Sequence, residues 1–140
     1  MPLVSVTRLR VRKWRFLPAF VVSAIRSALQ AKSATGAIRV AALADARLAF
    51  WTCTVWDDEK SMRAFMNSGI HRRIMPRLLD WCDEAAVAHW EQESSQSPSW
   101  LEAHGRMRRV GRRSRVRFPS AAQEQFDIPE PRTGAQLKLK

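Results

Sequence analysis

The fold is decided by residues 47–92, which read RLAFWTCTVWDDEKSMRAFMNSGIHRRIMPRLLDWCDEAAVAHWEQ. Residues 47–56 alternate between two sets of side chains, as a β-strand does. One set is Phe50, Thr52, Thr54 and Trp56, and the other is Ala49, Trp51, Cys53 and Val55. The stretch also contains four of the six tryptophans and two of the three histidines, so candidate site residues concentrate here.

Two helical segments and a second strand complete this stretch. Asp57-Asp58 places negative charge where a helix would begin, and we predict that helix over residues 59–67. Ser68-Gly69 breaks it, and a second helical segment follows over residues 71–81. Residues 85–91 return as a strand with alternating side chains.

The residues before this stretch supply one helix and two strands. Residues 3–11 alternate as a strand, and the two arginines on one of its faces suggest that this face opens toward water or a pocket. A helix is predicted from Pro18 to just before Gly36, with apolar residues at helical spacing. Residues 37–44 form a second strand, and Asp45-Ala46 is the predicted tight turn after it.

The predicted order is therefore strand, helix, strand, strand, helix, strand. This order is the α+β, ferredoxin-like βαββαβ pattern, an antiparallel sheet with helices on one face. We assign this domain to residues 1–92. The other face also carries apolar and aromatic residues, and we expect a second copy to cover it sheet to sheet.

Residues 93–140 form a basic C-terminal extension. A short helix is expected from near Ser99, and seven arginines follow between residues 106 and 117. Residues 106–140 carry 10 Lys/Arg against 3 Asp/Glu, whereas residues 1–105 carry 14 against 10. The excess favours an Arg-rich, partly mobile tail that is solvated, wraps around a dimer, or binds nucleic acid or another acidic partner.

The cysteines and the N-terminal helix indicate the compartment. Cys53 and Cys82 form no CxxC motif, so we expect a buried, reduced pair and no zinc or dithiol chemistry. Arg26 and Lys32 interrupt the apolar helix, and no apolar run reaches the ~18–20 residues that cross a bilayer. We therefore expect a cytoplasmic protein with no signal peptide, no membrane span and no metal site.

A family resemblance is carried by residues 50–81, FWTCTVWDDEKSMRAFMNSGIHRRIMPRLLDW. They combine a strand ending in Trp, an acidic cap, a helix with Phe and Met, and a Ser-Gly-x-His sequence. In these features the chain resembles the dimeric α/β-barrel superfamily, in particular antibiotic-biosynthesis-monooxygenase-like proteins and bacterial proteins of unknown function likened to spheroidene monooxygenase. The resemblance covers roughly residues 3–92 and implies a homodimer, with a pocket in each subunit between the helices and the sheet. Some relatives oxidise aromatic polyketides with dioxygen and no cofactor, while others have different chemistries.

Other relatives bind and break haem with an Asn on the first strand, a Trp on the second helix and a His near the end of that helix. An ungapped comparison anchored at Trp56 puts Phe65 at the position of that Trp and Met75 at the position of that His. The first strand has no Asn. We therefore expect no cofactor, with haem bound through Met75 or a histidine as a disfavoured alternative.

His71 is the candidate catalytic residue. It follows the glycine break at the start of a helical segment, and Arg72 and Arg73 follow it. Nearby cations and a helix N-terminus both favour the neutral imidazole, which suits a base or a hydrogen-bond donor near pH 7. The alternative is a surface or capping histidine.

The candidate ligand-binding residues lie on two predicted strands and beside His71. Trp56 and Phe50 would stack a planar apolar ligand while Thr54 orients it, although aromatic residues on a strand more often belong to the core. His89 and Trp90 lie on opposite faces of the last strand, so only one of them lines the pocket. The full set is Trp56, Thr54, Phe50, Arg72 and His89.

Three functions follow from these observations. The first is a monooxygenase-like protein that binds a planar apolar small molecule and oxidises it without a cofactor. The second is a non-catalytic binding or interaction module whose basic tail engages an acidic partner. The third is a haem-binding protein.

Overall fold

The chain folds around a six-stranded antiparallel sheet in this computed structural model, which describes residues 1–45, 48–132 and 135–140. The strand order is β5-β4-β1-β3-β2-β6. The strands are β1 (Leu3–Val11), β2 (Ala37–Ala44), β3 (Ala49–Trp56), β4 (Cys82–Glu91), β5 (Arg112–Arg113) and β6 (Ala135–Lys138). Of the predicted Asp45-Ala46 turn, residue 46 lies outside the described residues.

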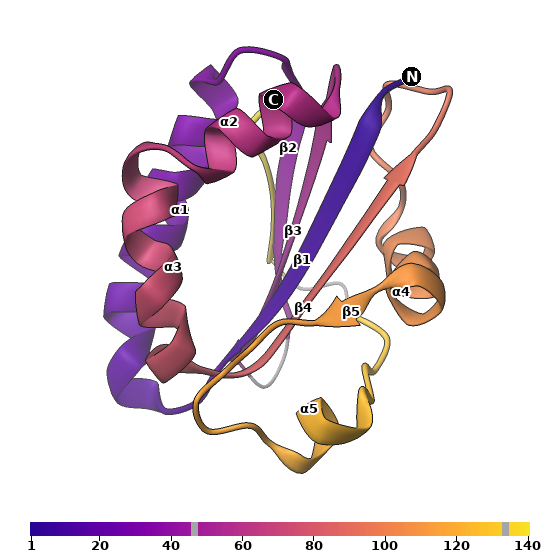
Figure 1. The fold of residues 1–140 in the computed structure, drawn as a ribbon. Helices are drawn as coiled ribbons and strands as arrows, with labels where there is room; N and C mark the ends of the chain where they lie inside the picture. Colours follow the sequence, from indigo (N-terminus) through magenta and orange to yellow (C-terminus); the bar gives the residue numbers. More distant parts are fainter. Residues whose placement is uncertain (46–47, 133–134) are drawn as a thin grey trace.

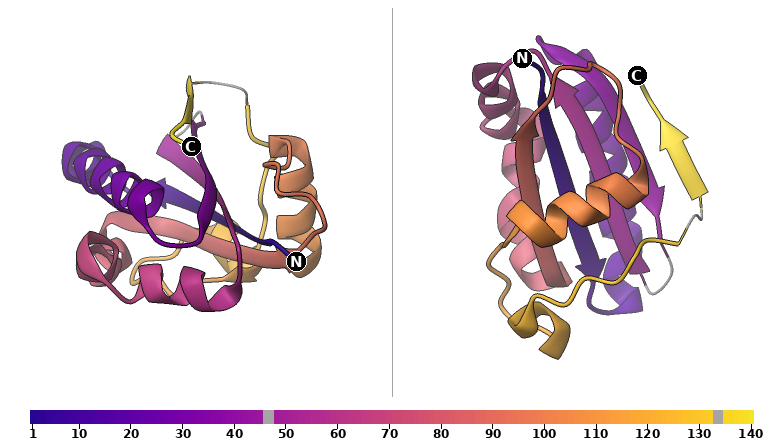
Figure 2. Two further views of the ribbon diagram at one scale, coloured as in Figure 1. Left: turned by 90° about the horizontal axis from the view of Figure 1, so that it is seen from above. Right: turned by 90° about the vertical axis from the view of Figure 1, so that its right-hand side faces the viewer.

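The helices are a 3-10 turn (Trp14–Phe16), α1 (Leu17–Ser33), α2 (Glu59–Met66), α3 (Gly69–Trp81), α4 (Trp100–Val110) and α5 (Ala121–Gln125). Helices α1 to α3 lie on one side of the sheet, and α4 lies on the other (Figures 1 and 2). Up to Glu91 the elements follow the order β1, α1, β2, β3, α2 with α3, and β4. This order confirms the predicted ferredoxin-like α+β fold.

Strand alternation divides the sheet into two faces, which we call the α1–α3 face and the α4 face. The register of β1 with β3 places Ser5 beside Thr54 and Thr7 beside Thr52 on the α1–α3 face. Residues between these, such as Val6 beside Cys53, lie on the α4 face. The α4 face is closed: its side chains on the central strands are buried.

The chain's own C-terminal extension covers the α4 face. Ala103 and Met107 of α4 and Ile128 are buried in one cluster with the sheet residues Val4, Val6, Leu43, Trp51, Cys53, Val55, Ala86, Ala88 and Trp90. The physical reason for expecting a second copy on this face is therefore removed, because the apolar surface is already buried. The homodimer itself stays a prediction.

The two arginines of β1 do not open this face to water. Arg8 is 5% exposed, and its Nη1 lies 2.7 Å from Oε1 of Glu84. Arg10 pairs with Asp83 at 2.6 Å. The expectation of a solvated face was wrong because β4 supplies a carboxylate for each arginine and the C-terminal extension lies over them.

Two short strands were not expected from the sequence. β5 pairs with β4 through Arg113 beside Ala86 and Arg112 beside Val87. β6 pairs with β2, with Lys138 beside Ala41. The C-terminal extension therefore supplies both edge strands of the sheet.

Candidate functional site

Three predicted site residues are connected through Phe65. Trp56, at the end of β3, is fully buried, and its indole Nε1 donates to Oγ1 of Thr54 at 2.8 Å. The ring of Phe65 lies 5.2 Å from that of Trp56 and 4.7 Å from that of His71, measured between centroids. Thr54, Trp56 and His71 are thus parts of one packed unit between β3 and helices α2 and α3, although His71 reaches Trp56 only through Phe65.

The ring of His71 is half-buried, and its tautomer follows from its partner. Nδ1 lies 3.2 Å from the carbonyl oxygen of Met66, which can only accept, so Nδ1 carries the proton and Nε2 keeps its lone pair in the neutral ring. Burial lowers the pKa of His71 below its usual value, and the Met66 carbonyl opposes this shift. The sequence predicted a neutral ring because of neighbouring arginines and a helix N-terminus, whereas the structure gives burial as the main cause.

Gln30 of α1 holds the break between α2 and α3. Its Oε1 accepts from the backbone N–H of His71 at 3.0 Å, and its Nε2 donates to the carbonyl oxygen of Ser68 at 2.9 Å. Gly69 has a φ of +57°, and a Cβ there would lie 2.9 Å from Oε1 of Gln30. The Ser68-Gly69 break therefore requires glycine both for its backbone angle and for the approach of Gln30.

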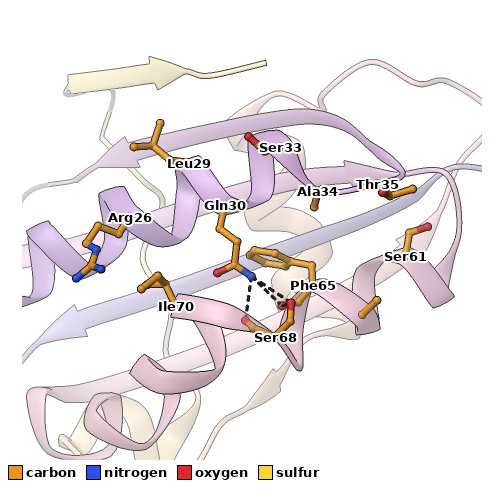
Figure 3. Close-up of a pocket in the computed structure, with 11 residues that line it drawn as sticks. Arg26, Leu29, Gln30, Ser33, Ala34, Thr35, Ser61, Phe65, Ser68 and Ile70 are labelled. Carbon is orange, nitrogen blue, oxygen red and sulfur yellow. Dashed lines mark hydrogen bonds between the residues drawn. The ribbon is translucent and has the colours of Figure 1, made fainter.

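An open groove lies beside Gln30, between α1 and the α2–α3 break (Figure 3). Its volume is about 700 Å³. Leu29, Ala64 and Ile70 are among its apolar lining residues, and Phe65 forms part of its wall. None of the predicted site residues is among its lining residues, and the groove meets the packed unit through Phe65 and through Gln30, which accepts from the N–H of His71.

The centre of the α1–α3 face is polar. The register places Thr54, Ser5 and His89 in one row across β3, β1 and β4, with Thr52 and Thr7 in the next row. We call these five residues the polar floor. Ser5, Thr7 and Thr52 are half-buried although they lie on inner strands under three helices, whereas the opposite face is closed. His89 is also half-buried, on β4, which β5 borders only at Ala86 and Val87. Solvent therefore reaches the middle of this face.

His89 has an unsatisfied nitrogen on the polar floor. Its Nε2 is buried and has no hydrogen-bond partner among the described residues. A buried polar atom without a partner is costly, which makes this atom a natural contact for a bound molecule. Burial lowers the pKa of His89, and Arg112 and Arg63 lower it further. Trp90 points to the α4 face, so His89 is the one of this pair that faces the floor.

The other candidates lie apart from this unit. Phe50 is at the far end of β3, where its ring packs 5.0 Å from that of Phe20 of α1. Arg72 is exposed on the outside of α3. Met75, the position compared with a haem-ligating His, is 43% exposed, which does not suit a residue that would hold haem in a pocket.

Some residues of the site were not found from the sequence. Gln30 and Ser5 carry no local motif, and their roles depend on contacts with residues 71 and 89, far along the chain. Alternation could have placed Ser5 on the floor, because it shares a face of β1 with Thr7.

Several features of the described chain bear on metals, thiols and membranes. Cys53 and Cys82 are buried free thiols, as expected, and burial raises the pKa of each to about 12. Within residues 1–45, 48–132 and 135–140, no cluster of His, Cys, Asp and Glu could hold a metal ion. In the same residues, no helix is long and apolar enough to span a bilayer.

Solved structures with a similar fold include proteins of unknown and of established activity. A conserved protein from Methanosarcina mazei Go1 is 17% identical with a TM-score of 0.60, covering 66% of this chain and 94% of that one. SnoaB, a cofactor-independent oxygenase from Streptomyces nogalater, is 15% identical with a TM-score of 0.56, covering 66% and 94%. The Rv0793 protein of Mycobacterium tuberculosis is 8% identical with a TM-score of 0.61, covering 67% and 97%.

At these identities the likeness shows a shared fold, the one found in monooxygenase-like proteins. The comparison with curated proteins finds no match. The match to a family is broader, since it extends over residues 18–131 and so includes α4, β5 and α5. The chain belongs to the family described as a domain of unknown function, DUF3291.

Proposed function

We propose that this protein binds a planar apolar small molecule on the polar floor, under helices α1 to α3, and oxidises it in a monooxygenase-like reaction without a cofactor. The observation that carries the proposal is the buried, unpartnered Nε2 of His89 on a face whose centre stays open to solvent. The fold shared with SnoaB, a cofactor-independent oxygenase, supports the reaction class.

The chemistry of the floor suits such a ligand. Threonine and serine hydroxyls donate or accept hydrogen bonds and would orient a flat molecule, while Val87 beside Thr7 offers apolar contact. A neutral histidine with a free lone pair can remove a proton from a hydroxyl or an activated carbon. His71 and His89 both have lowered pKa values and are therefore suited to this role near neutral pH.

A fluorescence titration with N-phenyl-1-naphthylamine, a neutral planar probe, tests the binding site. Thr52→Phe would fill the floor, and we expect it to weaken probe binding by about tenfold or more because the probe and the new ring compete for the same space. Ala64→Phe, which fills the groove instead, should leave binding unchanged. Loss of binding in Ala64→Phe alone, or in neither variant, would overturn the floor as the site.

Oxygen uptake with a panel of planar phenols tests the reaction. We expect His71→Ala and His89→Ala to lose uptake while far-UV circular dichroism shows a retained fold. Met75→Ala changes an exposed residue on the same helix as His71 and should leave oxygen uptake unchanged. Unchanged uptake in His71→Ala would remove the catalytic role of His71.

A second candidate function uses the arginines of the C-terminal extension. Arg108, Arg109 and Arg115 are exposed, so binding of nucleic acid or another acidic partner stays a prediction. Affinity for a single-stranded oligonucleotide should then fall steeply as salt rises, and a flat response would contradict it. The cytoplasmic location and the homodimer also stay predictions, and a dimer would need a surface other than the α4 face.

A further inference from the structure

The Arg-rich segment contributes to the sheet instead of forming only a solvated tail. Arg112 and Arg113 make up β5, which lies beside β4 (Figure 1). Residues directly opposite each other in an antiparallel pair point to the same face. Arg112, opposite Val87, therefore lies on the α1–α3 face, and Arg113, opposite Ala86, lies on the α4 face.

The two arginines differ in their partners. Arg113 donates from Nη1 to the carbonyl oxygen of Glu124 at 2.6 Å, so it is part of the contact with α5. Arg112 is exposed, and among the described residues no carboxylate pairs with it. Arg63, the other cation near His89, is already paired with Glu59 at 2.7 Å. Of the two arginines that act on His89 among the described residues, Arg112 is thus the one without a carboxylate partner.

The position of Arg112 relates it directly to His89. Val87 and His89 are successive residues on the same face of β4, and Arg112 stands beside the first of them. The electrostatic effect of Arg112 on His89 agrees with this placement, since Arg112 is the leading charge that lowers the pKa of His89. An unpartnered guanidinium and an unpartnered imidazole nitrogen therefore lie at the same edge of the polar floor.

We propose that the ligand of the polar floor is a planar acid, whose flat apolar body lies on the floor and whose anionic oxygens bind Arg112 beside His89. A carboxylate or a phenolate would accept charge-assisted hydrogen bonds from the guanidinium. This inference rests on the proposed function, because it assigns the substrate class for that same site.

Two probes that differ by one group test the proposal. 1-Anilinonaphthalene-8-sulfonate carries a sulfonate, and N-phenyl-1-naphthylamine is the same molecule without it. We expect the sulfonate probe to bind the native protein more tightly than the neutral one, and Arg112→Gln to weaken only the sulfonate probe, by about tenfold, as expected for one charge-assisted hydrogen bond. Arg113→Gln removes the same charge on the other face and should change neither affinity.

The outcomes separate this inference from the proposed function. In one outcome, Thr52→Phe weakens binding of the neutral probe, but Arg112→Gln and Arg113→Gln change the affinity for the sulfonate probe equally. The assignment of Arg112 is then overturned, and the floor remains the site. If neither probe responds to Thr52→Phe, the floor itself is overturned. A circular dichroism spectrum and an unfolding midpoint for each variant show that the fold is intact.

Discussion

Glu84 of β4 contacts two side chains of β1 and one of the C-terminal extension. Oε1 lies 2.7 Å from Nη1 of Arg8, and Oε2 accepts from Oγ of Ser120 at 3.0 Å and lies 3.8 Å from Nε of Arg10. Arg8 and Glu84 are both buried. Removing one member of a buried ion pair leaves the other charge without compensation, and this is far more destabilising than the pair is stabilising.

We therefore predict that Glu84→Gln lowers the free energy of unfolding by about 3 kcal/mol, measured by urea denaturation. Glu59→Gln is the matched control, because it breaks an exposed ion pair with Arg63 on α2. Its effect should be below about 0.5 kcal/mol. Equal effects of the two substitutions would contradict a buried, stabilising role for Glu84.

The two histidines of the site predict how stability depends on pH. Burial lowers the pKa of both His71 and His89 from the ordinary value of 6.5 in the folded protein. These two groups therefore bind protons at a higher pH in the unfolded chain than in the folded one. Their contribution to the free energy of unfolding is fully present above about pH 6.5 and is lost as the pH falls below that value.

The double variant His71→Asn/His89→Gln should lose less stability than the native protein between about pH 7.5 and pH 5.5, because it lacks both groups. Asn at position 71 keeps a donor for the Met66 carbonyl in place of Nδ1. Urea denaturation at both pH values measures the difference. An equal loss in the two proteins would show that other groups account for the pH dependence.

Gln123 of helix α5 is bonded to the sheet through its side chain. Its side-chain amide accepts from the N–H of Ala85 at 3.0 Å and donates to the carbonyl oxygens of Ala85 at 3.1 Å and Ser114 at 2.9 Å. The amide thus pairs with β4 as a further backbone unit would. Gln123→Ala removes the partner that Gln123 gives to the N–H of Ala85 and to the carbonyl oxygen of Ser114, whereas the Ala85 carbonyl still accepts from the N–H of Ser114 at 2.9 Å. The substitution should cost about 1–3 kcal/mol in urea denaturation.

Gln125→Ala, on the exposed side of the same short helix, should change stability by no more than about 0.5 kcal/mol. The comparison separates the hydrogen bonds of Gln123 from any change in helix propensity, which both substitutions share. A loss of similar size in both variants would mean that α5 is held by something other than this amide.

Elements up to Glu91 could be predicted because their signals are local. Alternation identified the strands and assigned Trp56 and Thr54 to one face of β3. The inward side of α1 was predicted less well: Ile25 and Leu29 belong to the apolar residues at helical spacing but are about half exposed, while Phe20 is buried. An apolar stripe shows which residues share a side of a helix, but which apolar side packs on the sheet depends on tertiary contacts.

The later elements and part of the site depend on pairing between distant residues. β5 and β6 are short and rich in polar residues, and they are strands because Arg113 meets Ala86 and Lys138 meets Ala41. Gln30 reaches the Ser68-Gly69 break from another helix. Sequence periodicity carries no information about such partners, so an Arg-rich run was interpreted as a tail.

At the scale of the molecule, the two faces of the sheet differ in how they are covered. The α4 face is buried by the chain's own extension, with Met107 and Ala103 fully enclosed against Trp51 and neighbouring apolar residues. The α1–α3 face keeps a polar, partly exposed centre. One face is therefore buried, while the other carries His89 and Arg112 at the edge of the site that we propose for the ligand.

This division predicts what happens when α4 is detached from the sheet. Met107→Arg puts a charge into the apolar contact and should release α4, exposing Trp51, Val55 and their neighbours. A contiguous apolar face of this kind drives association, so the mass measured by light scattering after size exclusion should rise above that of the native protein. Leu101→Arg adds the same charge to the exposed side of the same helix and should leave the mass unchanged. A native mass and a native unfolding midpoint for Met107→Arg would contradict the role of α4 as the cover of this face.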